Sequence, residues 1–338
     1  MKKIFGMLLA LCLFFGFTSC REKSASAQSP KSGKITVLAS VFPAYDWAKN
    51  LAAGSENVSV ELLLKDGVDL HSYQPSAKDI VKISTADIFI YVGGESDAWV
   101  SDALKNATNE KQIAINLMEV LKGFVKQEEV VEGMQSEREN EALEGEHDNE
   151  VLEGEREEES DEDEDEIEYD EHVWLSLNNA IASSNEIARA FMEKDESNAQ
   201  IYMANLVSYV QALSSLKDAY ANDFGGKTII VCDRFPFRYL TDEFGLNYYA
   251  AFVGCSAETE ASFETIAFLA KKCEELNANA VFVTESADKK IARTVISSAN
   301  RGEIPIITLD SMQSVTQKQA NKGADYLEIM RNNLEALK

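Results

Sequence analysis

Short apolar runs alternate with amphipathic stretches along most of this 338-residue chain. Runs such as Ile88–Val92 lack strict alternation of apolar and polar positions, which is typical of strands covered on both faces. Such runs predict strands at Ile35–Ala39, Val58–Leu64, Ile88–Val92, Ile113–Leu117, Thr228–Cys232, Tyr248–Phe252, Ala280–Val283 and Ile304–Leu309. The stretches between most of them have apolar residues at three- and four-residue spacing and predict helices. Strands that alternate with helices in this way favour an α/β fold with parallel sheets.

Two helical stretches follow one another in the middle of the chain without a strand between them. They cover Ala180–Glu193 and Ser197–Asn222, and Gly225-Gly226 ends the second. At 1.5 Å per residue the second helix would be about 39 Å long. The pattern predicts two Rossmann-like α/β lobes with parallel sheets, at residues 34–190 and 225–338, joined by a long rigid helix within 191–224.

The N-terminus predicts export from the cytoplasm. Lys2 and Lys3 precede an apolar run from Ile4 to Phe17, which is shorter than the roughly 20 residues that a membrane-spanning helix needs. Phe17-Thr18-Ser19-Cys20 resembles a bacterial lipobox, with Phe17 where leucine is usual. We expect a signal peptide at 1–20, lipidation of Cys20, a flexible tether at 21–33 and an extracytoplasmic, membrane-anchored protein. The alternative is a signal cut nearby, with Cys20 incidental.

One segment carries nearly all of the net charge. Residues 128–171 include 24 acidic and 2 basic residues and contribute −22 of the chain's −26, so the remainder carries only −4. Their composition predicts a disordered acidic loop over 127–171, inserted in the first lobe. No basic surface is visible in the sequence, which disfavours nucleic-acid binding.

The cysteines do not form a disulfide framework. Apart from Cys12 and Cys20, the chain has Cys232, Cys255 and Cys273, and an odd number in an exported body argues against a set of bridges. A single bridge between Cys232 and Cys255 stays open, because spacing alone does not decide it.

Only three histidines occur, at His71, His147 and His172. His71 follows a predicted strand and a glycine-containing turn, so it lies at the carboxyl end of a sheet strand, where α/β proteins bind ligands. His172 stands where the acidic loop re-enters the fold. Neutral imidazole is the commonest protein ligand of Zn²⁺. Either histidine by itself is more often a surface or hydrogen-bonded side chain.

The surroundings of the two histidines resemble a known family. His71 lies in Gly67-Val68-Asp69-Leu70-His71-Ser72-Tyr73-Gln74-Pro75-Ser76, and His172 in Asp170-Glu171-His172-Val173-Trp174-Leu175. Behind a lipobox and in this order, they resemble the solute-binding lipoproteins of zinc- and manganese-type ABC importers. The resemblance covers the chain beyond the tether and implies that both histidines bind metal. Glu171 departs from the family's proline.

The resemblance also implies ligands from the second lobe. Ile307-Thr308-Leu309-Asp310 matches the family's C-terminal Leu-Asp-Pro-Leu stretch, with Ser311 in place of proline, and implies Asp310 as a ligand. The remaining ligand should precede Phe237-Arg238-Tyr239. Ungapped counting places Arg234 there, which has no lone pair to donate. Asp233 is the preferred substitute and Cys232 the other. A His₂Asp₂ site would be more tolerant of Mn²⁺ than a His₃ site. Glu285, Glu258 and Glu260 are weaker candidates for orienting the ligands.

The function that the resemblance implies is capture of a divalent metal, Zn²⁺ with Mn²⁺ as the alternative, and its delivery to an ABC permease and ATPase by a monomer. In related zinc proteins the inserted loop is often histidine-rich. Here His147 and the carboxylates would either gather cations or form a solvated spacer. The chain has no H-E-x-x-H or nucleophile-elbow motif, so an enzyme is not expected. A metallohydrolase and an adhesin on the same scaffold are the rival interpretations.

Overall fold

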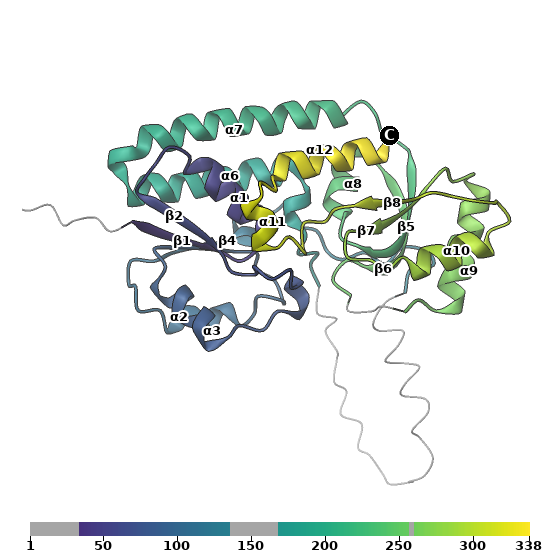
Figure 1. Ribbon diagram of the computed structural model, residues 1–338, viewed down its shortest axis with the longest axis horizontal. Coiled ribbons are helices and arrows are strands. Elements are labelled where there is room, and N and C mark those ends of the chain that lie inside the picture. Colours follow the sequence, from purple (N-terminus) through teal and green to yellow (C-terminus); the bar gives the residue numbers. More distant parts are fainter. Residues whose placement is uncertain (1–33, 136–167, 257–259) are drawn as a thin grey trace, which may run out of the picture. The chain divides into compact units, whose positions relative to one another are not determined.

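A computed structural model of the chain describes residues 34–135, 168–256 and 260–338. These residues form two four-stranded parallel sheets, in the strand orders β2-β1-β3-β4 and β6-β5-β7-β8. The predicted fold class, two parallel α/β lobes, is therefore confirmed (Figure 1). The predicted signal peptide, Cys20, the tether, His147 and Glu258 lie outside the described residues. Of the helices described, none is long and apolar enough to cross a bilayer.

The strands begin and end close to the predicted positions. In the first lobe they are β1 (Ile35–Ala39), β2 (Val58–Leu62), β3 (Ile88–Tyr91) and β4 (Ile113–Asn116). In the second lobe they are β5 (Thr228–Phe235), β6 (Asn247–Val253), β7 (Val281–Thr284) and β8 (Ile306–Leu309). Because every strand in a sheet is parallel to its neighbours, all of its carboxyl ends lie at one edge.

Helices cover both sides of the first sheet. The helices of this lobe are α1 (Phe42–Leu51), α2 (Ala77–Thr85), α3 (Val100–Lys105) and α4 (Leu117–Val120). Helix α2 begins directly after Ser76, because the Ser76 side chain accepts the Asp79 N–H and the Asp79 carboxylate accepts the Ser76 N–H. In Figure 1, α2 and α3 lie on the opposite side of the sheet from α1.

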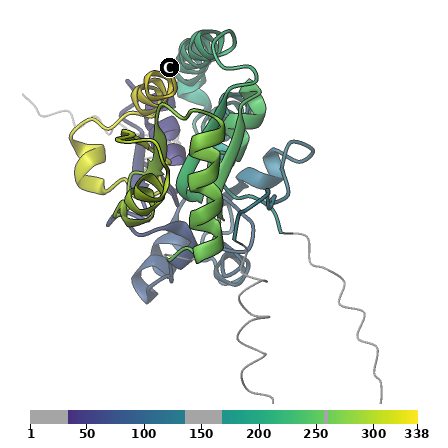
Figure 2. The same ribbon diagram turned by 90° about the vertical axis from the view of Figure 1, so that its right-hand side faces the viewer.

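Alternating side chains of the second sheet enter two different cores. Ile230 and Cys232 pack with α9 (Phe263–Glu275) and α10 (Lys290–Ser298), whereas Ile229 and Val231 join the larger core on the other face. This two-residue period follows from strand geometry. Helices α9 and α10 pack against each other beside the sheet (Figure 2). The larger core also holds α8 (Arg238–Phe244) and α12 (Tyr326–Leu337), and α11 (Gln317–Asn321) precedes α12.

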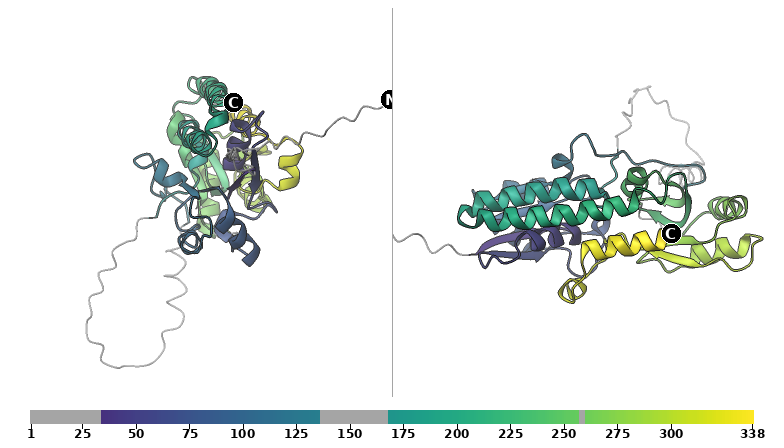
Figure 3. Two further views of the ribbon diagram at one scale, coloured as in Figure 1. Left: turned by 90° about the vertical axis from the view of Figure 1, so that its left-hand side faces the viewer. Right: turned by 90° about the horizontal axis from the view of Figure 1, so that it is seen from above.

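The larger core runs through both lobes. The predicted linking stretch 191–224 contains the end of α6 (Leu177–Lys194), a short 3-10 turn η3 (Glu196–Asn198) and α7 (Ala199–Tyr220). Helix α7 packs on α6, α1 and α12. Helices α6, α7 and α12 run side by side in the right-hand view of Figure 3. Apolar side chains from both sheets and all these helices form one continuous cluster. Burial of that shared apolar surface holds the lobes together.

The described flanks of the acidic segment pack on the second lobe. The Gln135 N–H donates to Ala251 O at 2.9 Å beside β6, and Glu129 pairs with Arg238 of α8 at 2.7 Å. Residues 128–135, which the sequence predicts to belong to the acidic loop of the first lobe, therefore contact β6, α8 and the Cys255 turn of the second lobe.

Asp46 connects the first lobe to the C-terminal helix. It lies on α1, almost completely buried, and its carboxylate accepts the Tyr326 N–H at 3.2 Å and the Asn50 side chain at 3.0 Å. Burial raises the pKa of Asp46 from 3.8 to about 7. The folded protein therefore binds a proton here between about pH 4 and pH 7 that the unfolded chain does not.

This carboxyl group should make stability depend on pH. Its contribution is fully present below about pH 4 and is lost as pH rises through 7, at a slope approaching roughly 1.4 kcal/mol per pH unit. We expect Asp46→Asn to flatten the decline in unfolding free energy between pH 4 and 8, measured by urea titration. The exposed Asp218→Asn on α7 is the control and should leave the slope unchanged. An Asp46→Asn slope equal to that of wild type would contradict the assignment.

Candidate metal centre

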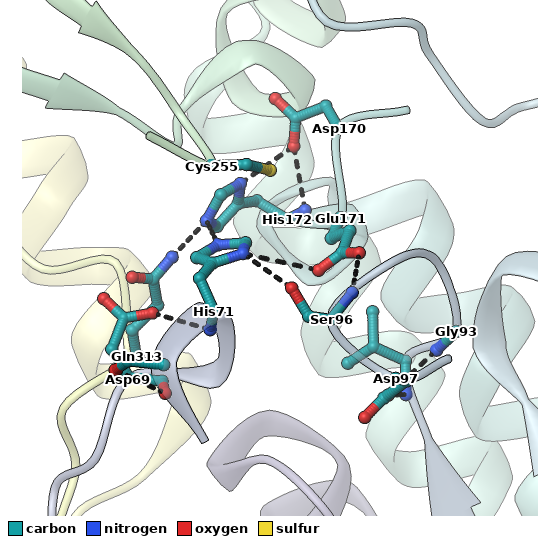
Figure 4. Close-up of polar contacts among 12 residues, drawn as sticks. Asp69, His71, Gly93, Ser96, Asp97, Asp170, Glu171, His172, Cys255 and Gln313 are labelled. Carbon is teal, nitrogen blue, oxygen red and sulfur yellow. Dashed lines mark hydrogen bonds and ion pairs between the residues drawn. The ribbon is translucent and has the colours of Figure 1, made fainter. Parts of the chain in front are cut away.

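Three loops bring donor side chains together between the facing edges of the two sheets. His71 lies in the 3-10 turn η1 (Leu70–Ser72) after β2, and His172 directly precedes the 3-10 turn η2 (Val173–Leu175). Cys255 lies in the turn after β6, so it comes from the second lobe. Within the described part of the chain, these side chains form a candidate metal-binding group, in which one ligand atom from each residue lies within 4.8 Å of the others. Figure 4 shows the two rings meeting, with the Cys255 thiol beside His172 and Asp170.

The two imidazoles meet through the same ring atom. The Nε2 atoms of His71 and His172 are 3.2 Å apart, and the rings are tilted by 55°. Two nitrogens bound tetrahedrally to one Zn²⁺ at about 2.0–2.1 Å would lie roughly 3.3 Å apart. The observed separation therefore fits two ligands of a single ion.

Carboxylates and a hydroxyl hold the other ring atoms. His172 Nδ1 lies 2.9 Å from Asp170 Oδ1, and His71 Nδ1 lies 2.8 Å from Ser96 Oγ and 3.5 Å from Glu171 Oε2. A carboxylate is only an acceptor, so Asp170 places the His172 proton on Nδ1 and leaves a lone pair on Nε2. His71 is also held through Nδ1, so the Nε2 atoms of both rings face the same place, which is the usual arrangement of metal-ligating histidines (Figure 4).

Burial keeps the His71 imidazole neutral and ready to bind. His172 is completely buried. Burial, and then the charge of a protonated His172, lowers the pKa of His71 from 6.5 to about 3. Burial raises the pKa of the Cys255 thiol, and Asp170 and Glu128 raise it further. The thiol is therefore protonated without a cation, and a bound metal ion would displace its proton.

Two glycines allow the carboxylate and the thiol to approach the histidines. A Cβ on Gly94 would lie 2.4 Å from Glu171 Oε1, and Gly94 also has a φ of +82°. A Cβ on Gly254 would lie 2.9 Å from the Phe235 carbonyl oxygen and 3.2 Å from His172 Nδ1 and Cε1. Glycine at 254 lets the backbone of the Cys255 turn lie against the His172 ring.

The loop after β8 closes the centre from the second lobe. The Gln313 side-chain amide contacts His172 Nε2, and Trp174 Nε1–H donates to Ser311 O at 2.9 Å. Rotation of that amide by half a turn would present its oxygen to the same point. Sequence reasoning missed Gln313, because an amide in a loop carries no distinctive pattern.

The structure does not place either predicted aspartate in the group of three donors. Asp310 Oδ1 accepts the Met312 N–H at 2.8 Å, and burial raises the pKa of Asp310 to about 6 with a smaller contribution from Glu285. Asp233 Oδ2 accepts the N–H and hydroxyl of Thr284. Asp233 and His71 do line the same cleft of about 420 Å³ between the lobes. The Glu285 carboxylate accepts hydrogen bonds from the Ser311 and Ser314 hydroxyls, within the Asp310 loop.

Arg234 is held by Asp69 and by the Ser256 carbonyl. Its guanidinium pairs with Asp69 across the lobes at 2.7 Å and donates to Ser256 O at 3.2 Å. Asp69 Oδ1 in turn accepts the His71 N–H at 3.1 Å. The residue at the family's histidine position therefore secures the η1 turn.

The described cysteines Cys232, Cys255 and Cys273 are free thiols, so the bridge left open between Cys232 and Cys255 is absent. Sequence reasoning considered Cys255 only as a disulfide partner. Its position just after the predicted strand Tyr248–Phe252 is the same strand-end signal that singled out His71 and Asp310. Applied to Cys255, that signal would have found it.

Two parallel α/β lobes with paired imidazoles between their facing edges define a metal-type solute-binding protein. The chain belongs to the ZnuA family, since the model of that family, described as "Zinc-uptake complex component A periplasmic", matches residues 37–338.

Curated relatives match over the whole chain. It is 28% identical over 340 residues to "Zinc-binding protein AdcA" of Streptococcus pyogenes serotype M3, with all of this chain and 61% of that protein aligned. The chain thus spans about three fifths of the length of AdcA. It is 27% identical over 341 residues to "High-affinity zinc uptake system protein ZnuA" of Bacillus subtilis, with all of this chain and 97% of that protein aligned.

Solved structures have the same fold. The Zn(II)-bound ZnuA-like domain of Streptococcus pneumoniae AdcA has a TM-score of 0.65 at 25% identity, covering 90% of this chain and 98% of that one. The periplasmic zinc-binding protein TroA of Treponema pallidum has a TM-score of 0.66 at 19% identity, with the same coverage, and shows the fold alone.

The Asp170–His172 hydrogen bond should determine metal affinity. Asp170→Asn removes the charge that fixes and strengthens the His172 donor, so we expect zinc to bind roughly 10- to 100-fold more weakly. Competition with a chromophoric chelator on the full chain would measure this. Asp102→Asn, exposed on α3, is the matched control. Equal affinities for the Asp170 variant and wild type would show that the hydrogen bond does not tune the site.

Proposed function

We propose that the chain is the extracytoplasmic solute-binding component of a zinc importer. In this proposal His71 and His172 capture Zn²⁺ between the lobes, and the loaded protein delivers it to a membrane permease driven by an ATPase. The observation that carries the proposal is the convergence of the two Nε2 atoms at 3.2 Å, each ring held through Nδ1. Here zinc is cargo, and the chain acts as its carrier.

Three further facts support zinc capture. The B. subtilis relative with nearly the same length is named for high-affinity zinc uptake. The AdcA domain with the same fold was solved with Zn(II) bound. Two imidazoles suit Zn²⁺ better than Mn²⁺, which prefers oxygen ligands. Manganese remains the alternative cargo, to be distinguished by competition.

We also propose that the mature protein is a lipoprotein held at the membrane through Cys20. The support comes from the Phe17-Thr18-Ser19-Cys20 sequence and from a 27% identical S. pneumoniae relative named "Zinc-binding lipoprotein AdcA". Laminin-binding proteins of streptococci have the same fold at 21% identity, which is evidence of fold alone, so adhesion is not proposed.

Asp310 and Asp233, proposed from the sequence, form one of two alternative sets of second-lobe ligands. In a His₂Asp₂ centre both aspartates would have to give up hydrogen bonds to bind the metal. Asp310 would lose the one from Met312 N–H, and Asp233 would lose those from Thr284. Asn in place of each aspartate keeps the size and removes the charge. A loss of affinity in Asp310→Asn or Asp233→Asn comparable to that of a histidine variant would place that aspartate in the ligand set.

The pair of histidines should account for stoichiometric binding. We expect one Zn²⁺ per full chain, with unfolding free energy raised by about 4 kcal/mol at a thousandfold excess over Kd. His71→Ala and His172→Ala should each abolish this gain, because either leaves one imidazole alone. Calorimetric titration and thermal unfolding would measure both effects.

His147→Ala is the matched control, since it removes the third histidine of the chain, and it should bind one zinc as wild type does. Titration of zinc against manganese on the same protein gives the preference. Binding that survives in the double variant His71→Ala/His172→Ala would refute the proposal. A preference for Mn²⁺ would make the cargo manganese.

A further inference from the structure

The group of three donors includes a sulfur atom that the family's ligand pattern does not contain. Cys255 Sγ lies within 4.8 Å of one ring nitrogen of each histidine and reaches the group from the second lobe. The family's remaining histidine position holds Arg234, whose guanidinium points to Asp69 and Ser256 O. The second lobe thus offers a thiol beside the imidazoles, while the residue at the expected position is engaged elsewhere.

Two contacts fix the Cys255 turn in place. The Cys255 N–H donates to Glu128 Oε1 at 2.9 Å, so the flank of the acidic segment holds the turn. On its other side, Gly254 lies so close to the His172 ring that an added Cβ would come within 3.2 Å of Nδ1 and Cε1. The thiol is free and half-buried, and nearby Asp170 faces both Cys255 and His172 (Figure 4).

We propose that Cys255 is the third ligand of the zinc centre and that its thiolate makes the site selective for thiophilic cations over Mn²⁺. This inference rests on the proposed function and specifies its ligand set and cargo. When the ion binds, the S–H bond gives up its proton to solvent and the sulfur lone pair forms the metal–sulfur bond, with no change of oxidation state. Gln313 lies against the same centre and is placed to occupy a fourth position.

The donor chemistry decides the selectivity. Thiolate and imidazole are ligands that Zn²⁺ accepts readily, with Zn–S near about 2.3 Å, whereas Mn²⁺ prefers carboxylate, carbonyl and water. One thiolate and two neutral imidazoles also leave the bound ion with a single net positive charge. A His₂Asp₂ centre would instead cancel both charges with hard oxygen ligands.

Cobalt provides the direct test, because Co²⁺ bound to thiolate gives a sulfur-to-metal charge-transfer absorption in the near ultraviolet. The full chain loaded with one equivalent of Co²⁺ should show this absorption, and Cys255→Ser should lose it. The variant's affinity for Zn²⁺ relative to Mn²⁺ should fall by at least the roughly 10- to 100-fold that supporting residues cost. Cys273→Ser and Cys232→Ser are matched controls that keep Cys255 and should keep the absorption.

The outcomes separate this inference from the proposed function. If the wild-type chain takes up no stoichiometric Co²⁺ or Zn²⁺, zinc capture itself is wrong. If one ion binds and needs both histidines, but the absorption is missing or survives in Cys255→Ser, capture stands and Cys255 is not a ligand. If Cys255→Ser fails to fold, the wild type and the two control variants are compared instead. Charge-transfer absorption in all three supports Cys255 as the ligand. Its absence in the wild type overturns the inference.

Discussion

The hydrogen bond between Asp170 and His172 Nδ1, at 2.9 Å in a completely buried setting, is the interaction on which the proposed metal centre depends. It fixes which nitrogen of the ring carries the proton and so turns the His172 Nε2 lone pair toward His71. Ser96 and Glu171 hold His71 through Nδ1, so its Nε2 faces His172. The two Nε2 atoms, 3.2 Å apart, are spaced as two ligands of one ion.

The fold supplies the rigidity that this arrangement requires. Parallel strands put every carboxyl end of a sheet at one edge, and the two edges face each other across the centre. A single apolar core runs through both lobes and α6, α7 and α12, so the lobes are held together by buried surface. Three polar contacts fix the lobes in one relative orientation. They are the ion pair of Arg234 with Asp69, the hydrogen bond from Trp174 to Ser311 O and the hydrogen bond from Tyr239 to Asp170 O. Donors from separate lobes can therefore meet within a few ångströms.

Hydrophobic patterns and short motifs predict the features of this protein that depend on neighbouring residues in the sequence. The parallel α/β lobes are confirmed, and the structure brings His71 and His172 together. Both could be predicted because strands and turn motifs are encoded in short stretches of sequence. The rest depended on distant parts of the chain. Counting back from Phe237 shows that Arg234 stands where the family has a metal-binding residue. It does not show that the Arg234 side chain reaches Asp69 in the other lobe. Cys255 and Gln313 meet His172 only after the sheets pack, and Glu128 holds Cys255 from a segment that composition had assigned to a loop of the first lobe.

In the proposed centre two imidazoles, with a sulfur from the second lobe, hold one zinc ion. Zinc K-edge X-ray absorption of the full chain, loaded with a single equivalent of Zn²⁺, tests this most directly. The account predicts outer-shell scattering from two imidazole rings and a sulfur scatterer at about 2.3 Å. A first shell of oxygen alone, without imidazole scattering, would place the ion on carboxylates elsewhere in the chain and contradict the claim.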